Sequence, residues 1–450
     1  MGIFFLILYL FTSFIFPGEI FPGLIPYHLP YWIGIGGLAA SLVLVFVRRG
    51  APLRSIQVYI LFGFFTVLIL SWVIADHSWG ALPEASKQFA PSLTMFVLTV
   101  CSVDSLRKLN VVTGFVVLLS FMILAQGFAA YHFGINKKMF LFDAARAEEH
   151  SPEADTVDES STDDPDEPAN EDDAPAKRIR GLGILHDPND LALSFVATLP
   201  LISIGVRRLR IMRFLLAFLL SAALCYGVYL THSRGGTLGL LFVLFCIFAR
   251  RVGRLRAVML VGILAIGAVA VDIGGGRSFS VQDESAVGRI DAWSEGLQML
   301  KSQPITGVGY RQFTEHHPLT AHNSFVLCFA ETGLVGYFLW LSLLGITLLQ
   351  LQKLKDLPES IPLELDIRRH ASILQAALIG FMAAAFFLSR TYVPFLYLLI
   401  GLSASLVLIA KKNDVPLVLP TYVRIGALIA ASELASIFLI YIIRELEFVA

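Results

Sequence analysis

Apolar runs of about 20 residues recur along the whole chain and leave little choice of fold. A helix of that length crosses the roughly 30 Å of hydrocarbon in a bilayer. About 12 or 13 such runs can be distinguished, although several are short for a full crossing. They lie near residues 3–16, 31–47, 57–75, 90–103, 109–133, 190–206, 214–231, 237–249, 257–273, 324–351, 371–389, 394–410 and 423–443. The sequence therefore predicts an all-α polytopic membrane protein.

The composition excludes an ordinary soluble globule. Of the 450 residues, 56% are hydrophobic and only 15% are charged, and the mean hydropathy is +0.72. The four cysteines lie within or beside apolar runs and show no CxxC spacing, so they predict neither a disulfide framework nor a zinc site. The chain also lacks the phosphate-binding pattern GxxxxGK[ST], which argues against direct use of ATP.

Clusters of lysine and arginine recur at every second connection between the apolar runs. Short loops rich in these residues are retained in the cytoplasm. The clusters lie at residues 48–54, 107–108, 207–213, 250–256, 353–369 and 411–412. This alternation predicts a cytoplasmic N-terminus and places the two longest connections on the outer side. The first apolar run lacks a basic leader and a cleavage site, so we expect a retained helix rather than a signal peptide.

The two long outer connections divide the chain into five parts. The expected parts are N-terminal membrane helices (1–133), an outer loop (134–189), central membrane helices (190–273), a second outer loop (274–323) and C-terminal membrane helices (324–450). Residues 148–173 of the first loop are dense in Asp, Glu, Ser, Thr and Pro, and cannot bury enough surface to order themselves. We expect a disordered acidic insert, with binding of a basic partner or divalent cations as the alternative.

The second outer loop contains a helical pattern. Ile290, Trp293, Leu297 and Leu300 recur at helical spacing, and Pro304 ends the pattern. Such an amphipathic helix is expected to lie flat at the membrane surface, with its tryptophan at headgroup level and an arginine in its first turn. The glycine-rich string TGVGY that follows predicts a turn rather than a phosphate-binding loop.

An ordered set of motifs in the second half of the chain resembles one known family. The set consists of THSRGG (231–236), GR followed by a tryptophan (288–293), PITGVG (304–309), AHNSF (321–325) and AETGLVG (330–336). Together these motifs resemble the O-antigen ligase and polymerase superfamily over roughly residues 180–336. The resemblance implies a GT-C-like fold in a bacterial inner membrane. It also implies a metal-independent glycosyltransferase without a cofactor, whose periplasmic site uses an undecaprenyl-diphosphate-linked glycan.

The functional residues of that family fall on matching positions of this sequence. The arginine of its SR motif is Arg234, the arginine of its GR motif is Arg289, and the histidine of its HN motif is His322. The proline-asparagine segment of the family is matched by residues 187–189, with Arg180 upstream. Supporting positions are Arg180, Asn189, Asn323 and Glu331. The acidic insert departs from the family pattern and leaves the shape of the first outer loop open.

The chemistry of these side chains agrees with the assignment. Guanidinium groups donate bidentate hydrogen bonds to phosphate oxygens and stay charged, which suits Arg234 and Arg289 to bind a diphosphate. An imidazole with a pKa near 6.5 can accept the proton of an attacking hydroxyl, which suits His322 as the base or as the residue that orients the acceptor. Direct attack inverts the anomeric carbon. The alternative roles are an interfacial anchor for each arginine, a helix cap for His322 and a packing residue for Glu331.

Three functions remain open from the sequence. A ligase transfers the finished glycan to an acceptor glycolipid such as lipid A core, whereas a polymerase transfers it to another lipid-linked oligosaccharide. The third is a glycan or ion transporter, which predicts inverted repeats and ionisable residues near the bilayer centre. No repeat is evident, and the polar residues gather at one surface. The expected partners are the lipid bilayer, the lipid-linked donor and the acceptor, and no nucleic acid.

Overall fold

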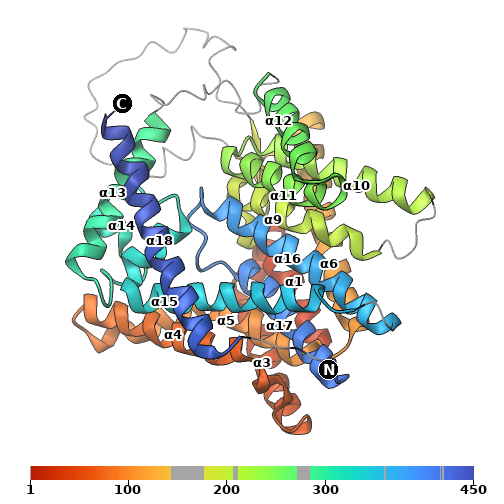
Figure 1. Cartoon of the computed structure of the whole chain (residues 1–450), viewed down its shortest axis with the longest axis horizontal. Coiled ribbons are helices and arrows are strands. Elements are labelled where there is room, and N and C mark those ends of the chain that lie inside the picture. Colours follow the sequence, from red (N-terminus) through yellow and green to blue (C-terminus); the bar gives the residue numbers. More distant parts are fainter. Residues whose placement is uncertain are drawn as a thin grey trace.

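The protein is a bundle of long helices that pack side by side (Figure 1). The structure is a computed structural model and describes residues 2–142, 177–205, 211–270, 284–358, 361–415, 417 and 420–449. The long helices are α1 (Gly2–Phe14), α3 (Leu29–Val47), α4 (Ile56–Ala75), α5 (Leu82–Ser102), α6 (Leu106–Phe133), α9 (Pro188–Thr198), α10 (Ile211–Leu230), α11 (Arg234–Val252), α12 (Arg254–Ala270), α13 (Glu284–Ser302), α15 (Ser324–Lys355), α16 (Pro362–Ala385), α17 (Pro394–Lys412) and α18 (Tyr422–Val449).

Short elements join the long helices. They are α2 (Pro17–Ile20), η1 (Pro22–Tyr27), η2 (Ala51–Arg54), η3 (Trp79–Ala81), α7 (Lys137–Phe140), η6 (Gly183–Leu185), η7 (Leu199–Gly205) and α14 (Phe313–His316). Strands β1 (Leu141–Phe142) and β2 (Arg178–Ile179) pair antiparallel. The predicted acidic insert, residues 148–173, lies outside the described residues.

Each predicted apolar run falls on a helical segment, and this agreement confirms an all-α polytopic membrane protein. Within the described part of the chain, six helical segments are long and apolar enough to cross a membrane. They are Pro22–Val47, Ile56–Ala75, Leu106–Phe133, Ser324–Lys355, Pro394–Lys412 and Tyr422–Glu445. The remaining apolar segments include α1 and parts of α10, α11 and α12 (Leu215–Leu230, Arg234–Phe248 and Leu255–Ala265), which are shorter. The total of 12 or 13 crossings stays a prediction.

One predicted run is broken rather than continuous. The run at 190–206 begins as α9, but α9 ends at Thr198 and the tighter helix η7 follows. Pro200 lies in the second position of η7. Because proline has no backbone N–H and clashes with the preceding turn, an α-helix cannot continue through it without a break. The chain therefore changes helix type inside this predicted span.

Several predicted basic connections gather at one end of the bundle, here called the basic end. Arg48, after α3, forms an ion pair with Asp104 before α6, with Nη2 and Oδ2 2.5 Å apart. Lys108 pairs with the same carboxylate at 2.8 Å. At the start of α4, Gln57 donates to Gln350 near the end of α15 at 2.6 Å. These contacts place the ends of α3, α5 and α15 together with the starts of α4 and α6.

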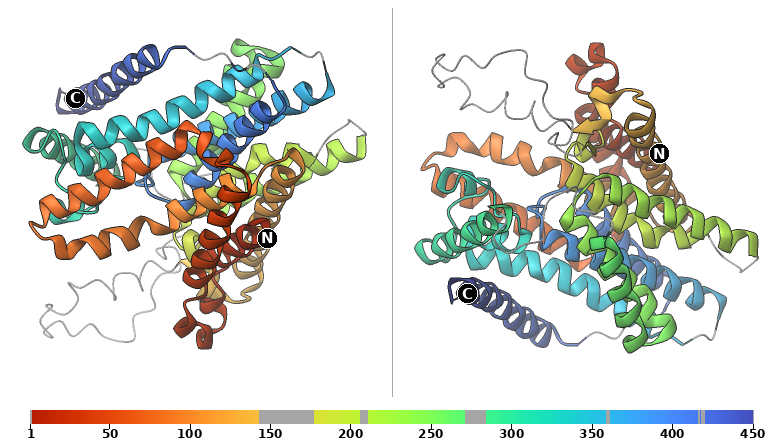
Figure 2. Two further views of the ribbon diagram at one scale, coloured as in Figure 1. Left: turned by 90° about the horizontal axis from the view of Figure 1, so that it is seen from below. Right: turned by 90° about the horizontal axis from the view of Figure 1, so that it is seen from above.

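The opposite ends of the same helices meet at what is here called the site end. Ser324, the first residue of α15, donates through Oγ to the carbonyl of Leu388 after α16, at 2.5 Å. Ser92, in the middle of α5, donates to the carbonyl of Tyr392 between α16 and α17, also at 2.5 Å. Helix α15 thus runs from one end to the other. Figure 2 shows α4, α5 and α15 lying alongside one another in this way.

The amphipathic helix predicted in the second outer loop exists as α13, but its environment differs from the expectation. Trp293 is only 6% exposed, and Leu297 and Leu300 are also buried. The apolar stripe of α13 packs against α15, and the indole of Trp293 packs against Phe386 at a centroid distance of 5.7 Å. The tryptophan is therefore a protein contact rather than a headgroup anchor, and Arg289 lies in the second turn instead of the first.

Candidate functional site

The site begins at the N-terminus of α9, where the predicted proline-asparagine segment lies. Asp187 caps the helix, and its Oδ1 accepts from the backbone N–H of Asn189 at 2.6 Å. The amide oxygen of Asn189 accepts from Ser233 at 2.7 Å and from the guanidinium of Arg178 at 3.2 Å. Asn189 therefore joins the first outer loop to the SR motif, which lies 44 residues away in the sequence.

The SRGG motif forms the first turn of α11. Ser233 caps the helix by accepting from Gly236 N–H at 3.1 Å, and Arg234 is its first residue. A Cβ at Gly235 would come within 3.0 Å of Phe387, and a Cβ at Gly236 within 2.5 Å of Ala192. Both glycines therefore let the turn that carries Arg234 pack against α9 and against the connection between α16 and α17.

His322 immediately precedes the cap of α15. Its backbone is left-handed, with φ 47°, and Asn323 caps the helix by accepting from the N–H groups of Phe325 and Val326 at 2.9 and 3.3 Å. The amide oxygen of Asn323 is thus committed to the helix start. The half-buried imidazole of His322 is fixed at the junction between loop and helix.

Helix α13 holds Arg289 close to His322. The indole N–H of Trp293 donates to the carbonyl of Ala321 at 2.9 Å, directly before His322. One turn earlier on α13, a Cβ at Gly288 would lie 3.3 Å from Leu319. These two contacts clamp the segment before His322 onto the helix that carries Arg289. The spacing between the arginine and the tryptophan of the GR motif therefore lets one helix carry Arg289 and also hold the segment that leads to His322.

A fourth arginine reaches the site from the connection between α16 and α17. The backbone N–H of Arg390 donates to Ser324 Oγ at 2.7 Å, which ties the connection to the start of α15. The guanidinium of Arg390 pairs with Asp190, and its Nη2 lies 3.6 Å from Asp187 Oδ1. Sequence reasoning missed this residue. Its signal was an arginine in a short connection on the side where the basic clusters are absent.

The charges around His322 favour its neutral form. Burial lowers the pKa of the imidazole, the positive charges of Arg289 and Arg390 lower it further, and Asp187 acts in the opposite direction. Among the described residues, four arginines (178, 234, 289 and 390) and three aspartates (187, 190 and 291) lie in the segments that form this region. Helices α9, α11 and α15 also begin here, and helix N-termini carry partial positive charge. The arrangement therefore suits an anionic ligand.

Two of the supporting residues lie outside this group of arginines. Arg180 donates to the carbonyls of Met139 and Lys138 at 2.9 and 3.0 Å, so its guanidinium joins two parts of the first outer loop. Glu331 lies about two turns inside α15 and is 2% exposed. Its carboxylate accepts from the backbone N–H of Phe313 at 3.4 Å, which links α15 to the second outer loop.

The PITGVG and AETGLVG motifs interlock behind the site. Helix α15 kinks at Gly333, whose φ is 62° and ψ −169°. The loop packs into this kink through three backbone hydrogen bonds: Val308 N–H to Ala330 O at 2.9 Å, Gly309 N–H to Glu331 O at 3.1 Å and Leu334 N–H to Pro304 O at 2.8 Å. The predicted turn is confirmed, and it anchors the chain between α13 and His322.

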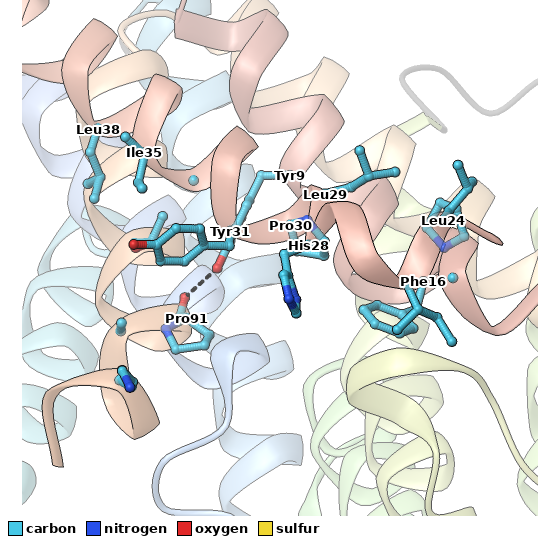
Figure 3. Close-up of a pocket in the computed structure, with 17 residues that line it drawn as sticks. Tyr9, Phe16, Leu24, His28, Leu29, Pro30, Tyr31, Ile35, Leu38 and Pro91 are labelled. Atoms are coloured by element: carbon cyan, nitrogen blue, oxygen red, sulfur yellow. Dashed lines mark hydrogen bonds between the residues drawn. The ribbon is translucent and has the colours of Figure 1, made fainter. Parts of the chain in front are cut away.

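An apolar cavity of about 410 Å³ lies at the site end between α1, η1, α3 and α5. Figure 3 shows Phe16, Leu24, Leu29 and Tyr31 around it. The hydroxyl of Tyr9 donates a hydrogen bond to the carbonyl of Pro91 at 3.3 Å. The cavity is near the site segment because Gly183, four residues before Asp187, donates to Glu19 on α2 at 3.0 Å.

Comparison with known proteins agrees with the motifs. A comparison with curated proteins finds no match. The family model described as O-Antigen ligase matches residues 216–341, from α10 to the middle of α15. This stretch carries Arg234, Arg289 and His322. Residues 216–341 are thus similar to the O-antigen ligase family, and this match supports the O-antigen ligase superfamily and, broadly, an O-antigen ligase-like membrane glycosyltransferase.

Proposed function

We propose that this protein transfers a glycan from undecaprenyl diphosphate to an acceptor glycolipid, such as lipid A core, at the periplasmic face of a bacterial inner membrane. The observation that carries the proposal is the cationic group around His322, at the opposite end of the bundle from the basic connections. If basic connections are cytoplasmic, the site faces the periplasm. The N-terminus is then cytoplasmic.

The donor is bound through its diphosphate. Arg234 and Arg289 donate to the phosphate oxygens, and the N-terminus of α11 contributes the positive end of its dipole. Arg390 adds positive charge from the other side while its two aspartates hold it in place. The isoprenoid tail stays in the bilayer or in the apolar cavity beside α1 and α3, which offers it a hydrocarbon surface at the same end of the molecule.

The transfer is a single displacement at the anomeric carbon. The acceptor hydroxyl oxygen attacks this carbon, the bond from the carbon to the phosphate oxygen breaks, and the electron pair leaves with the diphosphate. His322 takes the hydroxyl proton, which its neutral imidazole can accept. Arg234 and Arg289 stabilise the charge that develops on the leaving phosphate. Attack from the opposite face inverts the configuration. The arginines neutralise the diphosphate, so no step of this scheme calls for a metal ion.

Substitution of the proposed base and of one arginine tests the scheme. His322→Ala and Arg289→Ala are each expected to abolish transfer without lowering the amount of protein in the membrane. His316→Ala and Arg424→Ala are the matched controls, because both residues are exposed and neither contributes to the charge around His322. Normal transfer by either site variant contradicts the assigned role.

Deletion of the gene distinguishes a ligase from a polymerase. A ligase deletion leaves lipopolysaccharide without polymer while lipid-linked polymer accumulates, and this is the expected result. Accumulation of single unpolymerised repeats instead identifies a polymerase. Labelling of single cysteines placed at positions 234, 289 and 322 checks the side of the membrane. Labels that reach these positions from opposite faces contradict the proposed site.

A further inference from the structure

A second cavity, mainly polar, lies at the basic end, far along the helices from His322. It has a volume of about 480 Å³ and lies between α6, η7 and α16. Its apolar wall is formed by Leu106, Val111 and Ile204, and its polar wall includes Arg107, Arg369 and His370. The proposed glycan transfer uses none of these residues. The cavity therefore needs an explanation of its own.

The polar wall is built and rigid. His370 is only 6% exposed, and its ring is held at both nitrogens: Nδ1 lies 2.6 Å from the carbonyl of Asp366, and Nε2 lies 2.6 Å from Asn110 Oδ1. The guanidinium of Arg369 donates to the carbonyl of Ser203 in η7, which sets its direction. These bonds join the three elements that enclose the cavity.

Arg107 supplies a cation that no acidic side chain of the described residues pairs with. It is the second residue of α6, where the helix dipole is already positive, so the protein gains nothing electrostatically from placing it there. Among the described residues no ion pair involves Arg107, whereas its neighbour Lys108 pairs with Asp104 at 2.8 Å. Of the described residues in the lining, Asp366 alone is acidic and two are arginines.

Retention of cationic loops in the cytoplasm explains why arginines occur at this end, but not why they converge. Residues that serve only this purpose can point into water. Here two arginines meet beside an apolar wall, with His370 joining α16 to α6 behind them, and this combination accepts a phosphate group attached to hydrocarbon chains. We infer that this cavity binds the phosphate headgroup of an anionic phospholipid from the cytoplasmic leaflet, with its acyl chains against Leu106, Val111 and Ile204.

This inference is independent of the proposed glycan transfer and needs only that the basic end faces the cytoplasm. The bound lipid would join α6, η7 and α16 through a single headgroup. It would therefore stabilise the packing of α16, which leads from this cavity to the connection that carries Arg390. A lipid requirement for stability is then expected even in variants that lack transferase activity.

Lipid titration of the full-length protein in detergent tests the inference, with bound lipid counted by native mass spectrometry. Phosphatidylglycerol is expected to bind the protein, and phosphatidylcholine is not. The double variant Arg107→Gln/Arg369→Gln should bind phosphatidylglycerol roughly 30-fold more weakly, since each surface arginine contributes on the order of a kcal/mol to binding an anionic lipid. The charge-matched control is Arg49→Gln/Arg54→Gln, because both arginines are exposed at the same end and outside the cavity.

Three results would overturn the inference. Equal loss of binding in the two double variants would show a general attraction to charge instead of a site. Equal binding of phosphatidylcholine would remove the role of the arginines. Binding of inorganic phosphate as tight as that of the lipid would identify a site for a soluble anion. Val111→Trp is a second variant that fills the cavity from an exposed position and keeps both arginines and the bond between His370 and Asn110, and it should weaken binding as well.

Discussion

Substitution of Gly333 by alanine probes how the second outer loop is attached to the bundle. Its φ of 62° and ψ of −169° lie in a region that is essentially restricted to glycine. A Cβ at this position would also come within 2.4 Å of the backbone of Ile305 and within 2.7 Å of Gly307 N. Alanine can be accommodated only if α15 straightens or if the loop moves away.

The cost follows from these two effects. The strained backbone contributes about 1–3 kcal/mol. Loss of the three backbone hydrogen bonds between the loop and α15 adds about 0.5–1.5 kcal/mol for each bond. The free energy of unfolding of Gly333→Ala should therefore fall by about 2.5–7.5 kcal/mol, and transfer should fall with it because the loop leads to His322.

Thermal unfolding of the purified protein in detergent measures this effect. Gly114→Ala is the matched control, because no atom lies within 4 Å of its Cβ and it occupies the middle of α6. Alanine there should leave the protein unchanged or stabilise it by up to about 1 kcal/mol. Equal melting temperatures for the Gly333 and Gly114 variants would refute the argument that the kink requires glycine.

Two further substitutions test the position and the protonation of His322. Trp293→Phe keeps an aromatic ring against Phe386 but removes the hydrogen bond to the carbonyl of Ala321. The free energy of unfolding should fall by about 1 kcal/mol, while the transfer rate should fall roughly ten- to a hundredfold. A loss of transfer no larger than the loss of folded protein would indicate a purely structural role. Arg390→Gln removes a positive charge that lowers the pKa of His322. The acidic limb of the pH–rate profile should therefore move to higher pH. An unchanged limb would contradict this electrostatic coupling.

The sequence predicted the membrane fold well because its signals are local. The length of an apolar run and the charges that flank it are properties of neighbouring residues, so each predicted run could be placed on a helix. The same reasoning failed for the environment of α13. An apolar stripe with Trp293 looks identical whether it faces lipid or protein, and only the packing of α15 decides between them. Pro200 is a local sequence signal for the break in the run at 190–206.

The site was predictable only where motifs carried it. Arg234, Arg289 and His322 were identified from the family resemblance, and the charges around His322 now supply a physical reason for two of them. Arg390 belongs to no recognised motif. Its ion pairs join positions about 200 residues apart, and nothing in the neighbouring sequence of either partner encodes such a contact. The ion pairs between Arg390 and the two aspartates are therefore visible only in the folded structure.

The arginines proposed to bind the donor also act on the proposed base, and this coupling predicts a pH dependence that changes with donor binding. In the free enzyme, burial and the charges of Arg289 and Arg390 lower the pKa of His322. A bound diphosphate brings negative charge to the same arginines and offsets their effect, so the pKa of His322 rises and the imidazole becomes a stronger base.

The acidic limb of kcat/KM for the donor reports the free enzyme, and that of kcat reports the complex. Because a base acts when deprotonated, each limb falls as the pH drops through the corresponding pKa. The limb of kcat should therefore lie at higher pH than the limb of kcat/KM. Coincident limbs, or the opposite order, would mean that the diphosphate does not bind beside His322.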